Sequence, residues 1–308
     1  MRVFVAGATG AIGKQLVPRL VEAGHEVYGM TRSESKQAML DDLGAVPVVA
    51  DALDPVQVAE AVGMARPDVI VDQLTSLSAV NPRHMERDFV LTNRLRTEGT
   101  DHLLSAGQTV GVRRFVAQSI GLYARTGGPV KSEDDPLDLS PAREMHDILA
   151  AVRRHEQVVL DARWTEGIVL RYGAFYGPGT SLAPGEMQFE MVRKRRFPIV
   201  GDGGGVFSFI HIADAAEATV AAVEHGSRGV YNVVDDEPAP VAEWLPALAE
   251  TLGAKKPFRV PRFVARLVAG EAAVVMMTDA RGASNAKAKR DLAWRPAHPS
   301  WRQGFEAA

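Results

Sequence analysis

The sequence predicts an α/β fold, in which a parallel sheet with helices on both faces is joined to a smaller C-terminal lobe. Three observations predict it. Short β-branched apolar runs alternate with helical patterns through the first half, which is typical of repeated βαβ units. The first apolar run is followed directly by a glycine-rich turn from Gly7 to Gly13. After Leu170, glycine and proline become dense and the apolar runs become isolated, which indicates a second region.

Each expected strand of the first half is short and almost wholly apolar, as a strand covered on both faces must be. These strands are expected at residues 3–6, 26–30, 46–50, 69–71, 115–118 and 167–170, with a return to the same sheet at 209–212 and 230–234. Helices are expected from residue 12 to Gly24, from Ser33 or Ser35 to before Gly44, and at 91–106, 143–162 and 214–225. From residue 235 onward the pattern predicts a smaller helical lobe.

The composition excludes several classes of protein. With 308 residues, 46% of them hydrophobic and 24% charged, the chain is typical of a globular protein of one large or two smaller domains. A net charge of -3 gives no reason to expect nucleic acid or an acidic membrane as a partner. The absence of cysteine excludes disulfides and thiolate metal sites, and the histidines and carboxylates lack ligand-like spacing, so no metal is expected. Without a visible leader or a spanning apolar segment, we expect a cytoplasmic protein.

The turn after the first strand needs glycine for separate reasons. Gly7 permits the tight reversal out of the strand, Gly10 lets the backbone approach a pyrophosphate, and Gly13 lets the helix pack on the strand. The helix that follows directs its free N–H groups at the bound anion. Because a strand precedes the turn and an amphipathic helix and a second strand follow it, dinucleotide binding is favoured over an ordinary strand-to-helix connection. The expected contacts are Gly7, Thr9, Gly10, Ala11, Ile12 and Gly13.

The G-x-x-G-x-x-G spacing of this turn resembles the short-chain dehydrogenase/reductase superfamily. In that superfamily, NAD-preferring members carry an acid at the end of the second strand, where this chain has Arg32. Since arginine can pair with a 2′-phosphate, the resemblance favours NADP(H) over NAD(H), with Arg32 and Lys36 as phosphate partners. Alternatively, Arg32 is a solvated loop charge and Glu34 reaches a ribose. Asp51 matches the position that contacts adenine in the superfamily, or it caps the helix near Asp54.

Further segments resemble the extended branch of this superfamily, which holds nucleotide-sugar epimerases and dehydratases together with many ketone and aldehyde reductases. They are residues 99–104, 114–119, 170–179, 201–203 with 209–216, and 292–296. The resemblance implies a Rossmann-type doubly wound parallel sheet with the active site at the carboxyl ends of its strands. It assigns residues 1–172 and about 206–234 to the dinucleotide-binding domain, and 173–205 and 235–308 to the smaller substrate-binding lobe. The further cofactor contacts expected are Ala52, Leu53, Leu74, Arg171 and Tyr172.

The catalytic pair of this family is missing. Ser119 matches the family's serine, which donates a hydrogen bond to the reacting carbonyl, or else it only satisfies its own backbone at a strand end. In the family, a tyrosine then protonates the carbonyl oxygen, and a lysine four residues later lowers the pKa of that tyrosine and holds the ribose. No tyrosine of this chain has a lysine four places on. An alignment through Glu156 places Ile148 and Val152 at the two positions.

Three explanations for the missing pair are open. In the first, a substitute acid serves, either Tyr123, which is close to Ser119 in sequence, or His146, because imidazole exchanges protons near neutrality. In the second, a conjugated or already polarised acceptor takes the hydride, and water supplies the proton. In the third, the chain binds its cofactor without turnover, as sensor-like members of the superfamily do.

The substrate class is constrained by a second departure. Nucleotide-sugar members carry an arginine that clamps the pyrophosphate, and the corresponding position here is Phe207, which cannot bind a diphosphate. Tyr176, Phe207 and Met276 are expected to line an apolar substrate pocket, although such residues are equally typical of a core. The basic run at 193–196 either binds an anion or is a solvated helix face.

We therefore expect an NADPH-dependent reductase of a carbonyl or conjugated acceptor on an apolar small molecule, with Ser119 polarising the acceptor oxygen. One alternative is a nucleotide-sugar epimerase or dehydratase, which the overall resemblance favours and Phe207 opposes. A second alternative is a non-catalytic NADP-sensing binding protein. The long helices at 91–106 and 143–162 match those that pair in dimers of the family, which suggests a homodimer.

Overall fold

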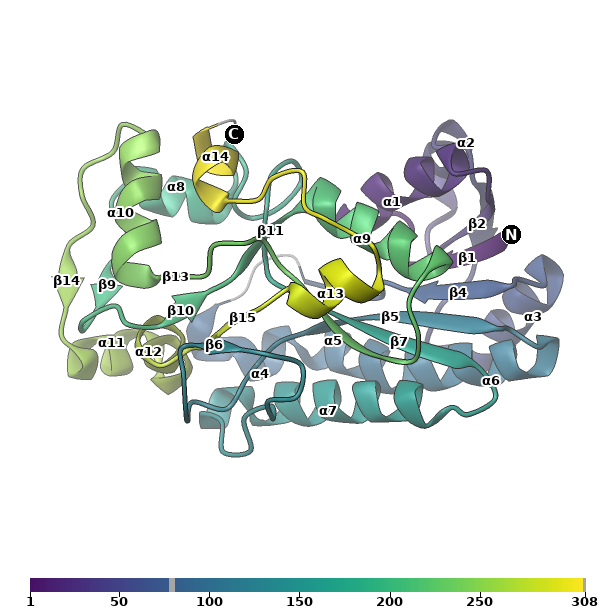
Figure 1. Ribbon diagram of the computed structural model, residues 1–308, viewed down its shortest axis with the longest axis horizontal. Coiled ribbons are helices and arrows are strands. Elements are labelled where there is room, and N and C mark those ends of the chain that lie inside the picture. Colours follow the sequence, from purple (N-terminus) through teal and green to yellow (C-terminus); the bar gives the residue numbers. More distant parts are fainter. Residues whose placement is uncertain (78–80, 307–308) are drawn as a thin grey trace.

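The computed structural model describes residues 1–77 and 81–306 and has a seven-stranded parallel sheet at its centre, as the sequence predicts. Its strand order is β12-β7-β5-β4-β1-β2-β3, and every neighbouring pair runs parallel (Figure 1). The seven strands are β1 (Arg2–Ala6), β2 (Glu26–Thr31), β3 (Val46–Val49), β4 (Val69–Asp72), β5 (Arg114–Ile120), β7 (Glu166–Tyr172) and β12 (Gly229–Val233). The order reverses between β1 and β4, which is the point where this class of sheet binds its ligand.

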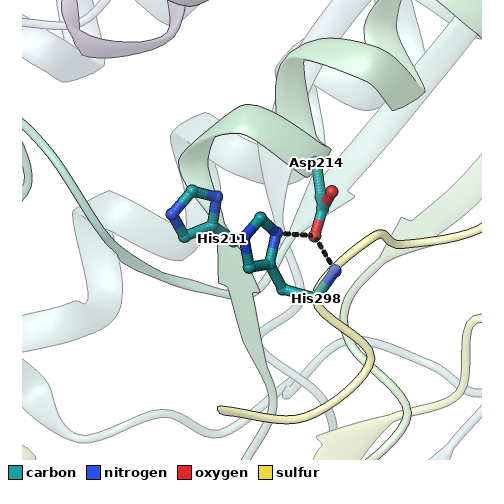
Figure 2. Close-up of side chains that lie close together, drawn as sticks. All are labelled: His211, Asp214 and His298. Carbon is teal, nitrogen blue, oxygen red and sulfur yellow. Dashed lines mark hydrogen bonds and ion pairs between the residues drawn. The ribbon is translucent and has the colours of Figure 1, made fainter. Parts of the chain in front are cut away.

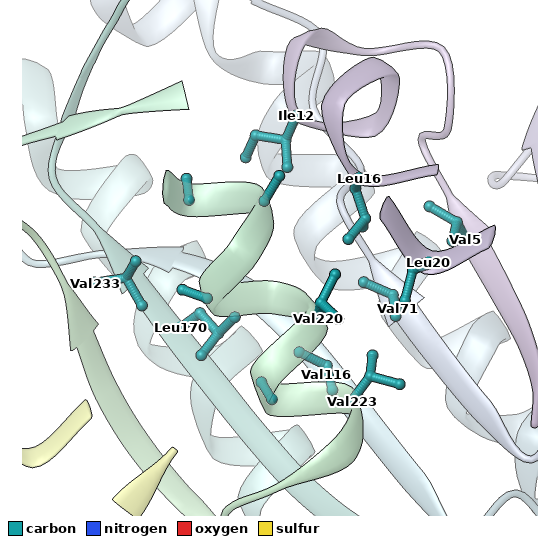
Figure 3. Packing of buried hydrophobic residues seen from close by; sticks show 14 of the residues in the cluster. Val5, Ile12, Leu16, Leu20, Val71, Val116, Leu170, Val220, Val223 and Val233 are labelled. Atoms are coloured by element: carbon teal, nitrogen blue, oxygen red, sulfur yellow. The ribbon is translucent and has the colours of Figure 1, made fainter. Parts of the chain in front are cut away.

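Helices cover both faces of the sheet. One face is covered by α1 (Ala11–Glu22), α2 (Gln37–Asp42) and α9 (Ile212–Glu224), whose apolar residues form one core with alternate strand residues (Figure 3). The other face is covered by α3 (Pro55–Ala65), α6 (Thr100–Val110) and α7 (His146–Asp161). Because both faces are buried, β4 and β7 are apolar along most of their length, as parallel strands require.

The helix expected at 91–106 is interrupted. It consists of α5 (Val90–Arg94), a π-helical turn η3 (Leu95–Gly99) and then α6. Shorter helical turns precede helices on both faces; they are η1 (Glu34–Lys36) before α2, and η2 (Pro82–His84), α4 (Met85–Asp88) and η4 (Arg143–Met145) on the face of α6 and α7. The homodimer that these long helices suggest stays a prediction.

The expectation that residues 209–212 return to the main sheet is wrong. This segment, β11 (Phe209–His211), pairs instead with β8 (Ala174–Tyr176) in a separate two-stranded sheet, and the main sheet resumes only with β12. A short apolar run does not reveal its partner, and β8 continues directly from β7 with only Gly173 between them. The carbonyl oxygen of Ser208 lies 2.6 Å from the place of a Cβ atom at Gly173, so only glycine fits there.

The smaller lobe is built on the carboxyl side of the sheet and packs around one aromatic core. Its helices are α8 (Met187–Arg193), α10 (Val241–Thr251), α11 (Arg262–Ala269), α12 (Glu271–Thr278) and α14 (Trp301–Glu306). The short helix α13 (Ala286–Asp291) packs instead on β12, and its Ala288 belongs to the core of the main sheet. The remaining strands outside the main sheet pair two by two, β9 (Ile199–Val200) with β14 (Arg259–Val260), β10 (Val206–Phe207) with β13 (Ala239–Pro240), and β15 (Gly282–Ala283) with β6 (Val130–Lys131). Within the described ranges, no helix combines the length and the apolar composition that crossing a membrane requires.

Candidate functional site

The glycine turn has the geometry of a cofactor cradle. Gly7 has a φ of 85°, and a Cβ atom there would lie 2.6 Å from the carbonyl oxygen of Gln73 at the end of β4. A Cβ atom at Gly13 would lie 2.4 Å from the carbonyl oxygen of Ala8, so α1 approaches the turn as closely as only glycine allows. No side chain caps α1, whose N-cap residue is Gly10. The first N–H groups of the helix can therefore bind a pyrophosphate.

The residues expected to hold the adenine half lie beside this turn. Arg32 and Lys36 are both exposed, just after the carboxyl end of β2 and within η1. Asp51 is also exposed, and its Oδ1 accepts the backbone N–H of Leu53 at 2.9 Å. Asp54, rather than Asp51, caps α3, since its side chain accepts the N–H groups of the first turn. This leaves one carboxylate oxygen of Asp51 for adenine. The role of each of these residues stays a prediction.

Ser119 lies at the end of β5, where it was expected, but its hydroxyl is engaged. The Oγ atom donates to Oε1 of Glu156 at 2.7 Å, and the serine is only 2% exposed. Glu156 also receives two hydrogen bonds from the guanidinium of Arg171, at 2.8 and 2.6 Å. The three side chains join β5, α7 and β7 in one buried network. In this arrangement Ser119 has no proton free to polarise an acceptor oxygen.

Tyr123 belongs to the same network. Its hydroxyl donates to Oδ1 of Asn232 and accepts from Nη1 of Arg171 at 3.2 Å. Burial raises the pKa of the Tyr123 phenol, and nearby Arg171 opposes that change only in part. A phenol that is hard to ionise and already donates its proton to an amide is poorly suited to act as the substitute acid.

The positions of the missing tyrosine and lysine belong to the apolar core. Ile148 is 1% exposed and packs with Phe89, Met145 and Val275. Val152 is fully buried and packs in the same cluster as Tyr123. Both side chains therefore contribute packing in place of proton transfer.

His146 does not join the other predicted catalytic residues. It begins α7, its side chain is 74% exposed, and its nearest charged partner is its neighbour Asp147 at 3.4 Å. Ser119 is buried in β5. This placement gives no support to His146 as the proton donor.

The three residues expected at the substrate lie in different surroundings. Tyr176 is fully buried among Phe209, His211 and Phe305 in the aromatic core of the lobe, so its assignment as a substrate contact is not supported. Phe207 is half-buried, stacks on Phe209 and lies tilted against Trp244 in the lobe core. Met276 lines a small cavity of about 60 Å³ beside Leu122 and Tyr123.

Arg171 and Tyr172, expected as cofactor contacts, are buried side chains of β7. The Tyr172 hydroxyl bonds Gln73 and Thr219, and burial raises its pKa to about 12. Their side chains thus hold the sheet to its helices. Of the other expected contacts, Ala52 is buried, Leu53 and Leu74 are half-buried, and the Leu74 carbonyl accepts a hydrogen bond from Gln118 at 3.0 Å.

Sequence reasoning missed a buried polar group between the central strands and the helices below them. Asp72, the last residue of β4, accepts the hydroxyl of Thr100 at 2.9 Å, and burial raises its pKa. His155 contacts the same hydroxyl at 2.9 Å, and its other ring nitrogen lies 3.0 Å from the carbonyl oxygen of Gln118. Arg96 lies nearby in the π-helical turn. Single polar residues within helical patterns give no sequence signal that they meet at one strand end.

Three possible metal ligands also meet in the fold although they are far apart in sequence. His211, Asp214 and His298 have ligand atoms within 4.8 Å of one another at the start of α9 (Figure 2). However, the Asp214 carboxylate accepts the N–H groups of Ala297 and His298 at 3.0 and 2.8 Å, and Nδ1 of His298 lies 3.0 Å away. These three contacts occupy most of the acceptor sites of the Asp214 carboxylate. The contacts of Asp214 therefore hold the C-terminal segment at residues 297 and 298 against α9.

The basic run at 193–196 begins at Arg193, the last residue of α8, and faces solvent. Arg193 and Lys194 pair with Glu190 at 2.7 and 2.9 Å, and all four residues of the run are exposed. The run is therefore a solvated surface, but only Arg193 lies on a helix, so the expected helix face is not present.

Comparisons with known proteins place these features in context. A family model described as the NAD dependent epimerase/dehydratase family matches residues 3–234. A 3-diazoavenalumate denitrifying reductase of a Streptomyces species is 45% identical over 307 residues, which are 99% of each chain. A 4-hydroxy-2-methyl-3-oxo-4-farnesyl-3,4-dihydroquinoline-1-oxide ketoreductase of Stigmatella aurantiaca is 30% identical over 276 residues, 87% of this chain and 79% of the relative.

Solved structures agree on the fold. The UDP-glucose 4-epimerase of Thermotoga maritima superposes with a TM-score of 0.78 at 21% identity, covering 99% of this chain and 96% of the other. The enzyme of the same name from Thermus thermophilus, in complex with NAD, gives a TM-score of 0.77 at 24% identity, covering 99% and 97%. At these identities the likeness concerns the fold alone.

Proposed function

The chain belongs to the NAD dependent epimerase/dehydratase family, and from this premise we propose that it is an NADPH-dependent reductase whose acceptor needs no proton from the protein. That it is an NAD(P)-dependent oxidoreductase follows from the family and from relatives that are named reductases. The proposal concerns the acceptor and the preference for NADPH. Its leading acceptor is a diazo-substituted aromatic acid.

The observation that carries the proposal is the lack of an available acid around Ser119. The family positions for tyrosine and lysine hold Ile148 and Val152, both in the apolar core. Ser119 donates its only proton to Glu156. Reduction of an ordinary ketone needs a proton on the developing alkoxide, which a positioned acid normally supplies. The described residues offer no such group beside Ser119.

A diazo acceptor removes this requirement. The cofactor supplies a hydride, whose electron pair forms a C–H bond at the carbon that bears nitrogen. The C–N bond breaks and its electron pair leaves with N₂, so an arenediazonium ion and NADPH give an arene, N₂ and NADP⁺. No alkoxide develops, and the balance contains no added proton. A site without a general acid is sufficient for this reaction.

The relatives support an electron-poor acceptor. The relative at 45% identity is named for 3-diazoavenalumate and for reductive loss of nitrogen. The ketoreductase at 30% identity is named for a farnesyl-bearing oxo-dihydroquinoline oxide. A conjugated ketone is therefore the second candidate acceptor. The cavity beside Met276 does not define the substrate, because its volume of about 60 Å³ is too small for an aromatic acid and the charged Arg125, Asp138 and Arg281 line it together with apolar side chains.

The preference for NADPH rests on charge at the end of β2. Arg32 and Lys36 are exposed there, and Glu34 is the one acid in the same turn. A guanidinium and an ammonium within four residues favour a 2′-phosphate. A nucleotide-sugar substrate is not favoured, because Phe207 stacks in an aromatic cluster at the position where the family clamps a diphosphate.

The proposal is tested by incubating the purified protein with NADPH and a panel of acceptors that contains a diazo-substituted aromatic acid, a quinone, an enone and a simple ketone. We expect NADPH oxidation with stoichiometric N₂ release from the diazo acceptor, slower turnover of the conjugated ketones, and none of the simple ketone. Turnover of the simple ketone alone would overturn the proposal, because it would require an acid that the site lacks.

A further inference from the structure

Arg96 is a buried cation, and two of its three guanidinium nitrogens bond to none of the described residues. It lies in the π-helical turn η3, and only 4% of it is exposed. Its Nε and Nη1 atoms have no hydrogen-bond partner among the described residues. Burial lowers the pKa of Arg96 to about 10, so the guanidinium stays charged at neutral pH. A buried charge without hydrogen bonds destabilises a fold and requires another explanation.

The nearby carboxylates do not explain it. Asp72 and Glu156 are the acids whose charges act on Arg96. However, the oxygens of Asp72 accept the N–H of Leu74 at 3.0 Å and the hydroxyl of Thr100 at 2.9 Å. Glu156 accepts Ser119 and Arg171. Both acids therefore act on the charge of Arg96 without accepting a hydrogen bond from its Nε or Nη1 atom.

The position of Arg96 points to the cofactor. Its carbonyl oxygen contacts His155 at 3.0 Å, and His155 contacts the carbonyl oxygen of Gln118 in β5, next to Ser119. Arg96 thus lies at the carboxyl ends of the central strands, where a dinucleotide crosses this type of sheet. The π-helical turn is a second indication, because such turns are frequent at functional sites.

An unpaired acceptor accompanies these unpaired donors. Asn93 precedes Arg96 by three residues, so the two share one side of the helix. Oδ1 of Asn93 is buried and has no partner among the described residues. A group that accepts from a guanidinium and donates to an amide oxygen would satisfy both residues. A hydroxyl does both.

We propose that Arg96 and Asn93 bind the hydroxyl groups of the nicotinamide-side ribose, and that Arg96 thereby takes over the ribose-holding role of the lysine that Val152 replaces. The inference rests on the dinucleotide binding in the proposed function, but not on the acceptor. Arg96 binds the cofactor and moves no proton.

The test compares Arg96→Met with Arg94→Met. Arg94 is the matched control, because it lies two residues earlier and pairs with Glu98 at the surface. Titration calorimetry would measure the Kd of NADPH, NADH, reduced nicotinamide mononucleotide and 2′,5′-ADP, and thermal unfolding would measure the Tm of the ligand-free proteins. Arg96→Lys keeps the charge and one donor.

We expect Arg96→Met to weaken NADPH and the mononucleotide about tenfold or more, with 2′,5′-ADP changed less than about twofold. Arg96→Lys should recover part of the affinity for NADPH and the mononucleotide, and Arg94→Met should bind both as tightly as the wild type does. Because the unpaired charge is removed, the Tm of ligand-free Arg96→Met should be equal to or above that of the wild type.

Three results would overturn the inference: unchanged affinity for the mononucleotide, equal losses for the mononucleotide and 2′,5′-ADP, or a lower Tm, which would make Arg96 a structural residue. Failure of the proposed function would look different. In that case NADPH would bind normally and depend on Arg96, yet no diazo or conjugated acceptor would be reduced.

Discussion

Ser119 donates its hydroxyl to Glu156 across 2.7 Å, and this bond joins the end of β5 to the middle of α7. Glu156 is held at the same time by Arg171 of β7, and the side chains of both residues are 7% exposed. Ser119, at the position that matches the family's serine, thus helps here to fasten three elements together.

Breaking the buried ion pair should cost much stability. Glu156→Gln removes the negative charge and leaves Arg171 buried without compensation, so we expect the free energy of unfolding to fall by about 3–5 kcal/mol. Urea denaturation measures this free energy of unfolding. The control is Asp101→Asn, which breaks the exposed pair with Arg154 between α6 and α7. That substitution should change the value by less than about 1 kcal/mol. An equal decrease in the free energy of unfolding in both variants would contradict the larger contribution assigned to the buried ion pair.

The cofactor cradle should not tolerate one added carbon. Gly13→Ala would place Cβ 2.4 Å from the backbone oxygen of Ala8, so the helix must shift. We expect the Kd for NADPH to rise at least about tenfold and the Tm to fall. Gly63→Ala is the matched control, because no atom lies within 4 Å of the added carbon in α3. It should bind NADPH normally and keep or raise the Tm, since alanine favours helix. A Kd for NADPH that is unchanged in Gly13→Ala would contradict the assignment of the glycine turn as the cofactor-binding site.

Asp235 should make the fold less stable as the pH rises. Burial raises its pKa to about 8, and the side chain is buried in the lobe. Between about pH 4 and pH 8, the unfolded chain releases this proton while the folded chain keeps it. Stability therefore falls with rising pH, by up to about 1.4 kcal/mol per pH unit.

Asp235→Asn removes this dependence. Denaturation at pH 5 and pH 7.5 should show a gain over the wild type that is larger at pH 7.5. If the gain were the same at both pH values, Asp235 would not carry a proton in the folded state.

Arg32 should discriminate between the two cofactors. Because Arg32 is exposed at the end of β2, its contact with a 2′-phosphate should contribute modestly. We expect Arg32→Ala to weaken NADPH about tenfold and to leave NADH within about twofold. Lys255→Ala removes an exposed charge from the lobe and serves as the control. Equal weakening of NADPH and NADH by Arg32→Ala would contradict a preference based on the phosphate.

The central sheet could be predicted because its determinants are local. Apolar runs, turn glycines and helical spacing locate β1, β4, β7 and α1 to within a few residues. The misplacement of β11 has a physical reason. Its residues suit any buried strand, and pairing with β8 depends on the close approach at Gly173, which involves residues far apart in the sequence.

The candidate site could be predicted only in part. The glycine turn and the loss of the catalytic pair are visible in the sequence, because each depends on residue identities at fixed spacing. Arg96 gives no such signal, since arginines on helices are usually solvated. The prediction for Tyr176 failed for a different reason. An aromatic residue beside a family motif is equally typical of a substrate pocket and of a core, and here Tyr176 lies in the core.

The pH dependence of single-turnover hydride transfer to a diazo-substituted aromatic acid tests the central claim most directly. A reaction without a protein acid should proceed at a rate that is constant from about pH 6.5 to 8.5 and that changes less than about threefold in Ser119→Ala and Tyr123→Phe. A rate that follows the titration of one group, or that falls about a hundredfold or more in either variant, would contradict the claim and identify a catalytic acid.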